Sequence, residues 1–322
     1  MSSLRVCVVG DLHLGMAAPS DTALPPLDEA GVDVLVSVGD IVDDNRDHAD
    51  AAETGHQYEA AGREWFQTVA TEYDVPIVAV PGNHDPVDCT ERLVSDVPNA
   101  VCAHKCVVDG SAFEQGSPLF EPFALVAMGC ERFNLRDGFT YDIVPELNPA
   151  NSDATDDLDY RARQTAERIE STFGRLLAGD LSVGEAATAL EVRDARRDAF
   201  ERCVETVTRR YERLVGLFDD AAAAPILVSH ESPFFVEFDY HHQWDGPGER
   251  LHRGSLPLKL AIRSEAPNAA FCGHIHNAGR DAVETVDGYC QVLNLGAGGV
   301  AIVDLDRDAG IIDIRRSDGS GP

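Results

Sequence analysis

The sequence has almost no lysine, and it carries a large excess of acidic residues. Lys105 and Lys259 are the only lysines among 26 basic residues, against 56 Asp and Glu, which gives a formal net charge of −30. The acidic residues are spread along the chain, as expected for a protein from a halophilic organism, where high ionic strength screens self-repulsion. This composition argues against broad nucleic-acid binding, which depends on Lys and Arg neutralising phosphates.

Long apolar runs, Cys-x-x-Cys pairs and a signal peptide are also missing. The longest apolar runs fall far short of the ~20 residues that a membrane helix needs. Residues 1–10 lead directly into a strand pattern without a basic start or a cleavage site, so we expect a cytoplasmic protein. Cys7, Cys130 and Cys272 lie inside apolar strand patterns, which predicts buried thiols rather than a disulfide framework.

Five apolar segments of strand length each end in a residue that can bind a metal ion. In open α/β sheets, ligands bind just beyond the carboxyl ends of the strands, so these residues are expected to meet at one edge. Side chains two apart on an extended segment share a face and can hold one ion together. The segments are 4–10 with Asp11 and His13, 32–38 with Asp40 and Asp43, 76–80 with Asn83, His84 and Asp85, 226–229 with His230, and 269–272 with His274 and His276.

The turn at residues 81–85 combines three kinds of functional group. Asn83 offers a neutral oxygen, His84 can donate a proton near neutral pH, and Asp85 places a carboxylate beside that imidazole. Gly82 permits backbone geometry that other residues resist. The turn is therefore typical of a site for metal binding and proton transfer.

The ordered blocks Asp-x-His, Gly-Asp-x-x-Asp, Gly-Asn-His-Asp, a single His and Gly-His-x-His resemble the calcineurin-like metallophosphoesterase superfamily. The resemblance covers residues 4–133 and 224–306, and it is specific because five blocks occur in order. It implies an α/β fold, a four-layer α-β-β-α sandwich of two mixed sheets. It also implies two divalent metal ions, with Mn²⁺ as the first choice and Fe or Zn²⁺ as alternatives that suit the same nitrogen and oxygen ligands.

The resemblance also assigns a role to each motif residue. Asp11, His13, Asp40 and His276 resemble the ligands of the first ion, and Asn83, His230 and His274 complete the second, with Asp40 shared. His84 matches the general acid of the family, Asp85 would orient it, and Asp43 matches a carboxylate behind the ligands. Turns and helix caps favour Asp as well, which is the alternative interpretation of Asp43 and Asp85.

These groups predict hydrolysis of a small phosphomonoester or phosphodiester, including a nucleotide. A hydroxide bridging the two ions would attack phosphorus in line, Asn83 would contact substrate oxygens, and His84 would protonate the leaving group. One alternative is an exonuclease or endonuclease of the DNA-repair type, whose Asp-Leu-His-Leu-Gly opening recurs at residues 11–15. Another alternative is a non-catalytic metal-binding scaffold for protein partners.

Residues 151–222 interrupt the family pattern, which occupies residues 1–150 and 223–322. Residues 151–222 show almost no pattern typical of strands. The motif Ser182-x-x-Glu185 matches a capping box at the start of a long helix, whose apolar residues recur at helical spacing as far as Phe218. Residues 153–177 predict a partner helix. We therefore expect a helical hairpin inserted into the core, with a homodimer formed through it as a further hypothesis.

The loop at residues 234–253 lies between two sets of ligand residues and is the candidate for reading the substrate. His241, His242 and Arg253 are its candidate substrate-binding residues, although local packing explains the loop equally well. Elsewhere the periodicity predicts a helix over residues 57–73 and a strand over 123–128. Three further strands, over 289–295, 300–305 and 311–315, are expected to close the second sheet as a meander.

Overall fold

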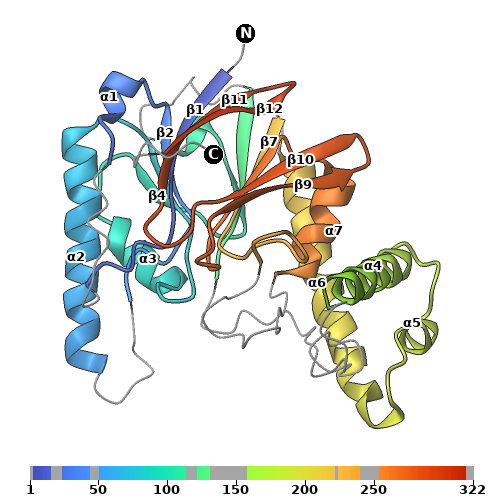
Figure 1. Cartoon of the computed structure of the whole chain (residues 1–322). Coiled ribbons are helices and arrows are strands. Elements are labelled where there is room, and N and C mark those ends of the chain that lie inside the picture. The colour runs from blue at the N-terminus through green and yellow to red at the C-terminus, as the bar shows by residue number, and fades with distance from the viewer. Residues whose placement is uncertain are drawn as a thin grey trace.

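Two six-stranded mixed sheets face each other, and helices cover their outer sides (Figure 1). The computed structural model describes residues 3–15, 24–43, 51–113, 122–130, 158–221, 224–239 and 254–316. The four α-β-β-α layers and the α/β class expected from the sequence are therefore confirmed.

The first sheet contains β1 (Ser3–Val9), β2 (Val34–Ser37), β3 (Ile77–Ala79), β4 (Ala100–Cys102), β11 (Val300–Asp306) and β12 (Gly310–Arg316). Their order is β12-β11-β1-β2-β3-β4. Strands β1 to β4 run parallel, whereas β11 is antiparallel to β1 and to β12. The carboxyl ends of β1, β2 and β3 therefore lie side by side.

The second sheet contains β5 (Cys106–Val108), β6 (Phe123–Met128), β7 (Ala224–Ser229), β8 (Ala269–Cys272), β9 (Gly279–Thr285) and β10 (Gly288–Asn294). Their order is β5-β6-β7-β8-β10-β9. The four central strands are parallel, and the edge strands β5 and β9 are antiparallel to their neighbours. Strands β7 and β8 are adjacent, so their carboxyl ends also meet.

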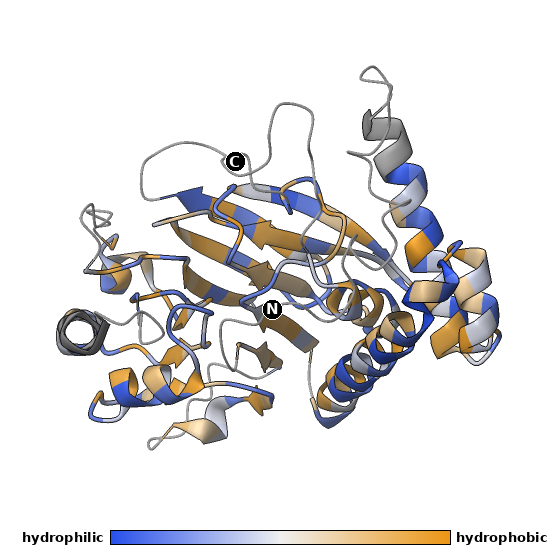
Figure 2. Cartoon of the chain, turned by 90° about the horizontal axis from the view of Figure 1, so that it is seen from below, coloured by the Kyte–Doolittle hydropathy of each residue, from blue (hydrophilic) through white to orange (hydrophobic). Residues whose placement is uncertain are grey.

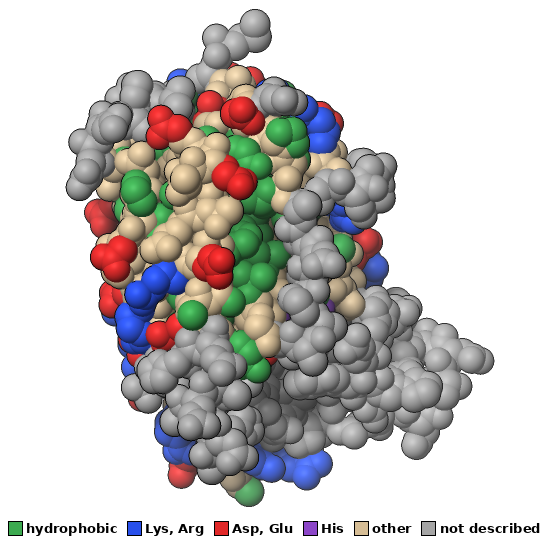
Figure 3. Space-filling model, turned by 90° about the vertical axis from the view of Figure 1, so that its left-hand side faces the viewer, with side chains coloured by type: hydrophobic (Ala, Val, Ile, Leu, Met, Phe, Trp, Pro, Cys, Tyr) green, Lys and Arg blue, Asp and Glu red, His purple; other side chains and the backbone are tan. Residues whose placement is uncertain are grey.

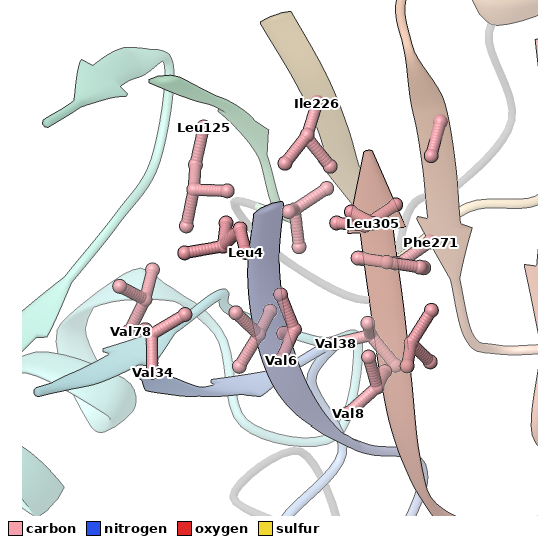
Figure 4. Packing of buried hydrophobic residues seen from close by; sticks show 14 of the residues in the cluster. Leu4, Val6, Val8, Val34, Val38, Val78, Leu125, Ile226, Phe271 and Leu305 are labelled. Carbon is pink, nitrogen blue, oxygen red and sulfur yellow. The ribbon is translucent and has the colours of Figure 1, made fainter. Parts of the chain in front are cut away.

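Apolar side chains fill the space between the two sheets (Figure 4). Leu4 and Val6 of β1 pack into the same buried cluster as Leu125 of β6, Ile226 of β7 and Phe271 of β8. Burial of each such side chain contributes about 1.5–3 kcal/mol before the cost of ordering it is counted. This shared core fixes the strand ends of one sheet relative to those of the other.

Helices on the outer faces complete the layers. The first sheet is covered by α1 (Leu27–Ala30), α2 (Ala51–Glu72) and α3 (Val87–Val94). Phe66 of α2 and Leu93 of α3 pack with Cys7 and Leu35 of the sheet. Because the strands lie between the layers, they are largely apolar, whereas the helices carry both polar and apolar residues (Figure 2).

Within its described residues, the helical segment expected between the two parts of the core has three α-helices rather than two: α4 (Leu158–Leu177), α5 (Val183–Ala189) and α6 (Arg197–Asp220). The capping box of Ser182 and Glu185 is present, but it opens only the seven-residue α5. The predicted continuous helix was wrong because the backbone turns after Leu190, where Glu191 has a φ of 57°.

These three helices pack against the rest of the protein at two places. Phe173 of α4 and Phe200 of α6 share a buried cluster with Leu260 of α7 (Leu256–Glu265), a helix of the second half of the chain. Near the carboxyl end of α6, Leu214 and Phe218 pack against the outer face of the second sheet. The carboxyl half of α6 is therefore a layer helix of the sandwich as well as part of the segment 151–222.

The prediction for the last three strands was wrong in part. β10 lies in the second sheet, where it pairs with β8 and β9, but β11 and β12 belong to the first sheet. β11 pairs with β1 along the full register from Ser3 opposite Asp306 to Val9 opposite Val300. Their apolar side chains consequently face both the shared core and the helices of the first sheet.

Among the residues the structure describes, no helix is long and apolar enough to cross a membrane. The described residues contain no disulfide bond, and Cys7, Cys130 and Cys272 are buried thiols as predicted. On the face shown in Figure 3, acidic side chains are scattered rather than gathered in one patch.

Candidate metal centre

The two sheets bring their carboxyl ends to one edge, where the loops after β1, β2, β3, β7 and β8 meet. Backbone bonds join the first two loops, since the N–H groups of His13 and Leu14 donate to the carbonyls of Asp40 and Ile41 at 2.9 and 2.7 Å. The N–H of Gly273 donates to the carbonyl of His230 at 3.1 Å and joins the loops of the second sheet. The residues expected at the ends of separate strands are therefore held together.

Four of the candidate ligands have a left-handed backbone conformation. The φ angles of Asp11, His13, Asp40 and His274 are 44°, 47°, 53° and 65°. Such a conformation costs a non-glycine residue about 1–3 kcal/mol, and it persists only where the surrounding structure holds it. Its concentration here indicates that the loops are shaped to aim side chains at a common point.

One cluster of donors contains Asp11, His13 and His276, whose ligand atoms all lie within 4.8 Å of one another. The Nε2 atoms of the two histidines are 3.2 Å apart. Asp11 accepts the backbone N–H of His274 on Oδ1 at 2.9 Å, while its buried Oδ2 has no hydrogen-bond partner among the described residues. A buried oxygen beside two converging imidazole nitrogens suits a cation.

A second cluster contains Asp40, His230 and His274, with Asn83 between the two histidines. The Asn83 Oδ1 lies 2.8 Å from His230 Nε2 and 2.9 Å from His274 Nδ1. His230 Nδ1 is 2.8 Å from the carbonyl oxygen of Val38, which can only accept, so Nδ1 carries the proton. In the neutral imidazole, Nε2 is then left to bind a metal.

Asp40 lies between the two clusters. Its Oδ2 is 3.9 Å from His13 Nε2 and 3.4 Å from His230 Nε2, and its side chain is 1% exposed. Its Oδ1 accepts the backbone N–H of His84 at 2.8 Å, which fixes the carboxylate. Gly82 permits this approach, because a Cβ there would lie 2.1 Å from Asp40 Oδ1. Asp40 is thus placed to serve both ions.

The electrostatics of these side chains also favour cations. Burial, reinforced by the charge of Asp40, raises the pKa of Asp11 to about 7. Burial alone would lower the pKa of His230, but the charge and hydrogen bond of Asp40 raise it to about 10. The pKa of the Asp40 carboxyl lies below its usual range. Burial would raise it, but the charge of His230 and the hydrogen bond to His230 outweigh burial. Buried carboxylates this close repel one another unless positive charge lies between them.

Asp43, not Asp85, is the carboxylate that contacts His84. Asp43 Oδ1 pairs with His84 Nδ1 and lies 3.6 Å from His13 Nδ1. Asp85 instead accepts three backbone N–H groups, from Asp40 at 2.9 Å, Ile41 at 2.7 Å and Gly82 at 2.8 Å. The contact with His84 that was expected of Asp85 is therefore made by Asp43, while Asp85 connects the loop after β3 to the loop after β2.

Some of the other predicted site residues lie at the metal centre, and others lie outside the described part of the chain. Asn83 and the metal ligands expected from the sequence converge as described, but His241, His242 and Arg253 lie outside the described residues. Sequence reasoning missed Arg210 of α6, whose Nη2 is 2.5 Å from Oε2 of Glu231, the residue after His230. No local pattern marked Arg210, because its spacing is that of an ordinary polar helix face.

These donors fit two divalent cations. Asp11, His13 and His276 would hold one, and Asn83, His230 and His274 the other, with Asp40 shared. Imidazole nitrogens mixed with carboxylate and amide oxygens suit Mn²⁺, Fe or Zn²⁺ better than an all-oxygen site for Ca²⁺ would. The third group of donors, His13, Asp43 and His84, contains the half-exposed His84 and is open to solvent.

The chain was compared with protein-family models, curated proteins and solved structures. A family model described as calcineurin-like phosphoesterase matches residues 4–278. Among solved structures, a dimetal phosphatase from Danio rerio is 15% identical, covers 98% of this chain and 99% of its own, and has a TM-score of 0.39. The sulfate thiohydrolase SoxB of Thermus thermophilus is 14% identical, covers 90% of this chain and 39% of its own, and has a TM-score of 0.38. No curated protein matches the chain.

Proposed function

The chain belongs to the calcineurin-like phosphoesterase family, and on that premise we propose that it hydrolyses a phosphomonoester or phosphodiester with two bound divalent cations, Mn²⁺ first among them. When bound, the cations would supply Lewis-acid polarisation of the phosphoryl oxygens and acidify a coordinated water. The chain's own residues would hold them, as described above, and would supply the proton for the leaving group.

The observation that carries this proposal is the position of His84. Its ring stands edge-on to that of His13, with centroids 5.0 Å apart, and its side chain is 33% exposed at the mouth of the centre. Burial acts to lower the pKa of His84, but the hydrogen bond to Asp43 and the charge of Asp40 outweigh it and raise the pKa. The raised pKa favours the protonated ring, which would donate to a departing alkoxide, a role typically worth about 10²–10⁴-fold in rate.

Asn83 has a complementary task in this proposal. Its side-chain oxygen faces the two histidines, so the amide N–H₂ on the other branch is available to donate to a phosphoryl oxygen. Phe235 N and Gly254 N, which begin and end the loop that follows Glu231, both donate to the buried Asp239 at 2.7 and 3.2 Å. This arrangement fixes the base of the loop that was predicted to read the substrate.

The test is a hydrolysis assay in molar KCl with and without Mn²⁺. The substrates are a chromogenic phosphomonoester, a chromogenic phosphodiester and single-stranded DNA. We expect metal-dependent release from at least one of the two small esters, and a loss of about 10²-fold or more in His84→Gln. Release that survives a chelator, or that is equal in His84→Gln, would contradict the proposal, and preferential cleavage of DNA would support the nuclease alternative instead.

A further inference from the structure

Four basic side chains gather beside the metal centre of this very acidic chain. Lys105, one of only two lysines, stands at the turn between β4 and β5, and Arg209, Arg210 and Arg213 stand on the part of α6 that packs against β5. Burial and the positive charges of Arg213, Arg210 and Arg209 lower the pKa of Lys105. Burial and, to a smaller extent, the positive charges of Lys105 and Arg213 lower the pKa of His104 to about 4.

Two of these side chains have no acidic partner among the described residues. Arg209 and Arg213 are four residues apart on one face of α6, and both are exposed. Like charges at this spacing destabilise a helix slightly, and Lys105 adds to the repulsion. In a chain with 56 acidic residues against 26 basic ones, the exposed side chains of Arg209 and Arg213 beside Lys105 indicate an anion-binding surface.

The cluster is connected to the metal centre on two sides. Arg210 pairs with Glu231, which follows the candidate ligand His230. On the other side, the His104 ring donates to the backbone carbonyl of Gly129, and the next residue, Cys130, donates its N–H to the carbonyl of Pro81 at 2.8 Å. Pro81 begins the turn that carries Asn83 and His84. The cluster thus borders the loops that hold the reacting groups.

We propose that Lys105, Arg209 and Arg213 bind a second phosphate group of the substrate, distinct from the one cleaved at the metal centre. This inference rests on the proposed phosphoesterase function. Lysine suits a phosphate as a point charge, and arginine can bind two of its oxygens at once. A small bisphosphorylated compound fits better than nucleic acid, because the net charge of −30 repels a long polyanion beyond the cluster.

The experiment compares α,ω-alkanediol bisphosphates of increasing chain length with alkyl monophosphates of matching length. Phosphate release by the Mn²⁺-loaded protein is measured at the lowest KCl concentration that keeps the far-UV circular dichroism of the folded state. The expected result is a kcat/KM at least tenfold higher for the bisphosphate at some chain length. That ratio should fall about tenfold or more in Lys105→Gln and in Arg209→Gln/Arg213→Gln, whose arginines are exposed and can change without disturbing the core.

Arg307→Gln is the matched control. Arg307 is exposed in the turn between β11 and β12, at the opposite end of the first sheet, and its replacement removes one positive charge, as Lys105→Gln does. The ratio should stay unchanged there. An equal fall in Arg307→Gln would show a general charge effect and overturn the inference, as would a wild-type ratio near one at every chain length. A single-stranded oligonucleotide that competes better than every bisphosphate would overturn the choice of a small substrate.

Failure of the proposed function gives a different result. If neither monophosphate nor bisphosphate is hydrolysed, calorimetric binding of the same two compounds tests the cluster alone, because binding needs no turnover. A preference for the bisphosphate that Arg209→Gln/Arg213→Gln abolishes would support the inference, and equal binding of the two compounds would contradict it.

Discussion

Replacing Asp85 should destabilise the protein far more than replacing an ordinary turn residue. Its carboxylate is 1% exposed and accepts three backbone N–H groups that belong to two different loops. Two of the donors, Asp40 and Ile41, follow β2, and the third, Gly82, follows β3. Asp85→Ala removes all three acceptors together and loosens the connection that positions Asp40 relative to Asn83.

The magnitude follows from the hydrogen bonds. A buried N–H left without an acceptor costs about 1–3 kcal/mol, so three cost about 3–9 kcal/mol. Water entering the space left by the carboxylate recovers part of this, and we expect about 3–5 kcal/mol. Asp85→Asn keeps the oxygen that accepts from Asp40 and Gly82 but turns an amide toward the N–H of Ile41, so it should cost about 1–3 kcal/mol.

The assay is urea-induced unfolding in molar KCl, with and without Mn²⁺, on wild type, Asp85→Asn, Asp85→Ala and a control. Asp88→Ala is the control, because its carboxylate is exposed and its surface ion pair with Arg92 at 3.3 Å is worth less than about 1 kcal/mol. Wild type and Asp88→Ala should be the most stable, Asp85→Asn should be less stable, and Asp85→Ala should be the least stable. An Asp85→Ala midpoint equal to that of Asp88→Ala would refute the role assigned to Asp85.

Three further predictions concern other parts of the molecule. Asp43→Asn should retain both ions but lower kcat about 10–100-fold, most on esters with poor leaving groups, because His84 loses its carboxylate; an equal loss on all leaving groups would contradict this. Phe218→Ala should lower the free energy of unfolding by about 3–5 kcal/mol, since this side chain joins α6 to the second sheet; a cost below 1 kcal/mol in urea titrations would argue that α6 is not a layer helix. The thermal midpoint should rise steeply between dilute and molar KCl, where the Debye length falls to ~3 Å, and an unchanged midpoint would oppose the halophilic interpretation.

The sequence predicts the strand ends well because each one combines two signals. A continuous apolar run marks a strand buried on both faces, and a polar group directly after it marks the edge of the sheet. Strand β9 carries no such signal, because Gly279–Thr285 is an edge strand with mostly exposed or half-buried residues. Its pairing partner β10 shields only one side of it.

Sheet membership and carboxylate roles depend on the fold rather than on local pattern. The alternation in Val300–Asp306 is the same whether the strand joins the first sheet or the second, and only its pairing with β1 decides. In the same way, Asp85 is adjacent to His84 in sequence, but its carboxylate binds the backbone of the loop after β2. Asp43 belongs to that loop, and its carboxylate contacts His84. Loop conformation, including the positive φ of Asp40, sets these directions.

If Asp40 serves both metal sites, its replacement should remove both ions, and the metal content of the purified variants measures this. Each protein is loaded with Mn²⁺, dialysed and analysed by mass spectrometry of the metal, with circular dichroism to establish folding. Wild type should hold two ions per chain, and His276→Ala about one. Folded Asp40→Ala should hold fewer than one, because its carboxylate faces both donor clusters. Two ions retained in folded Asp40→Ala would contradict the account.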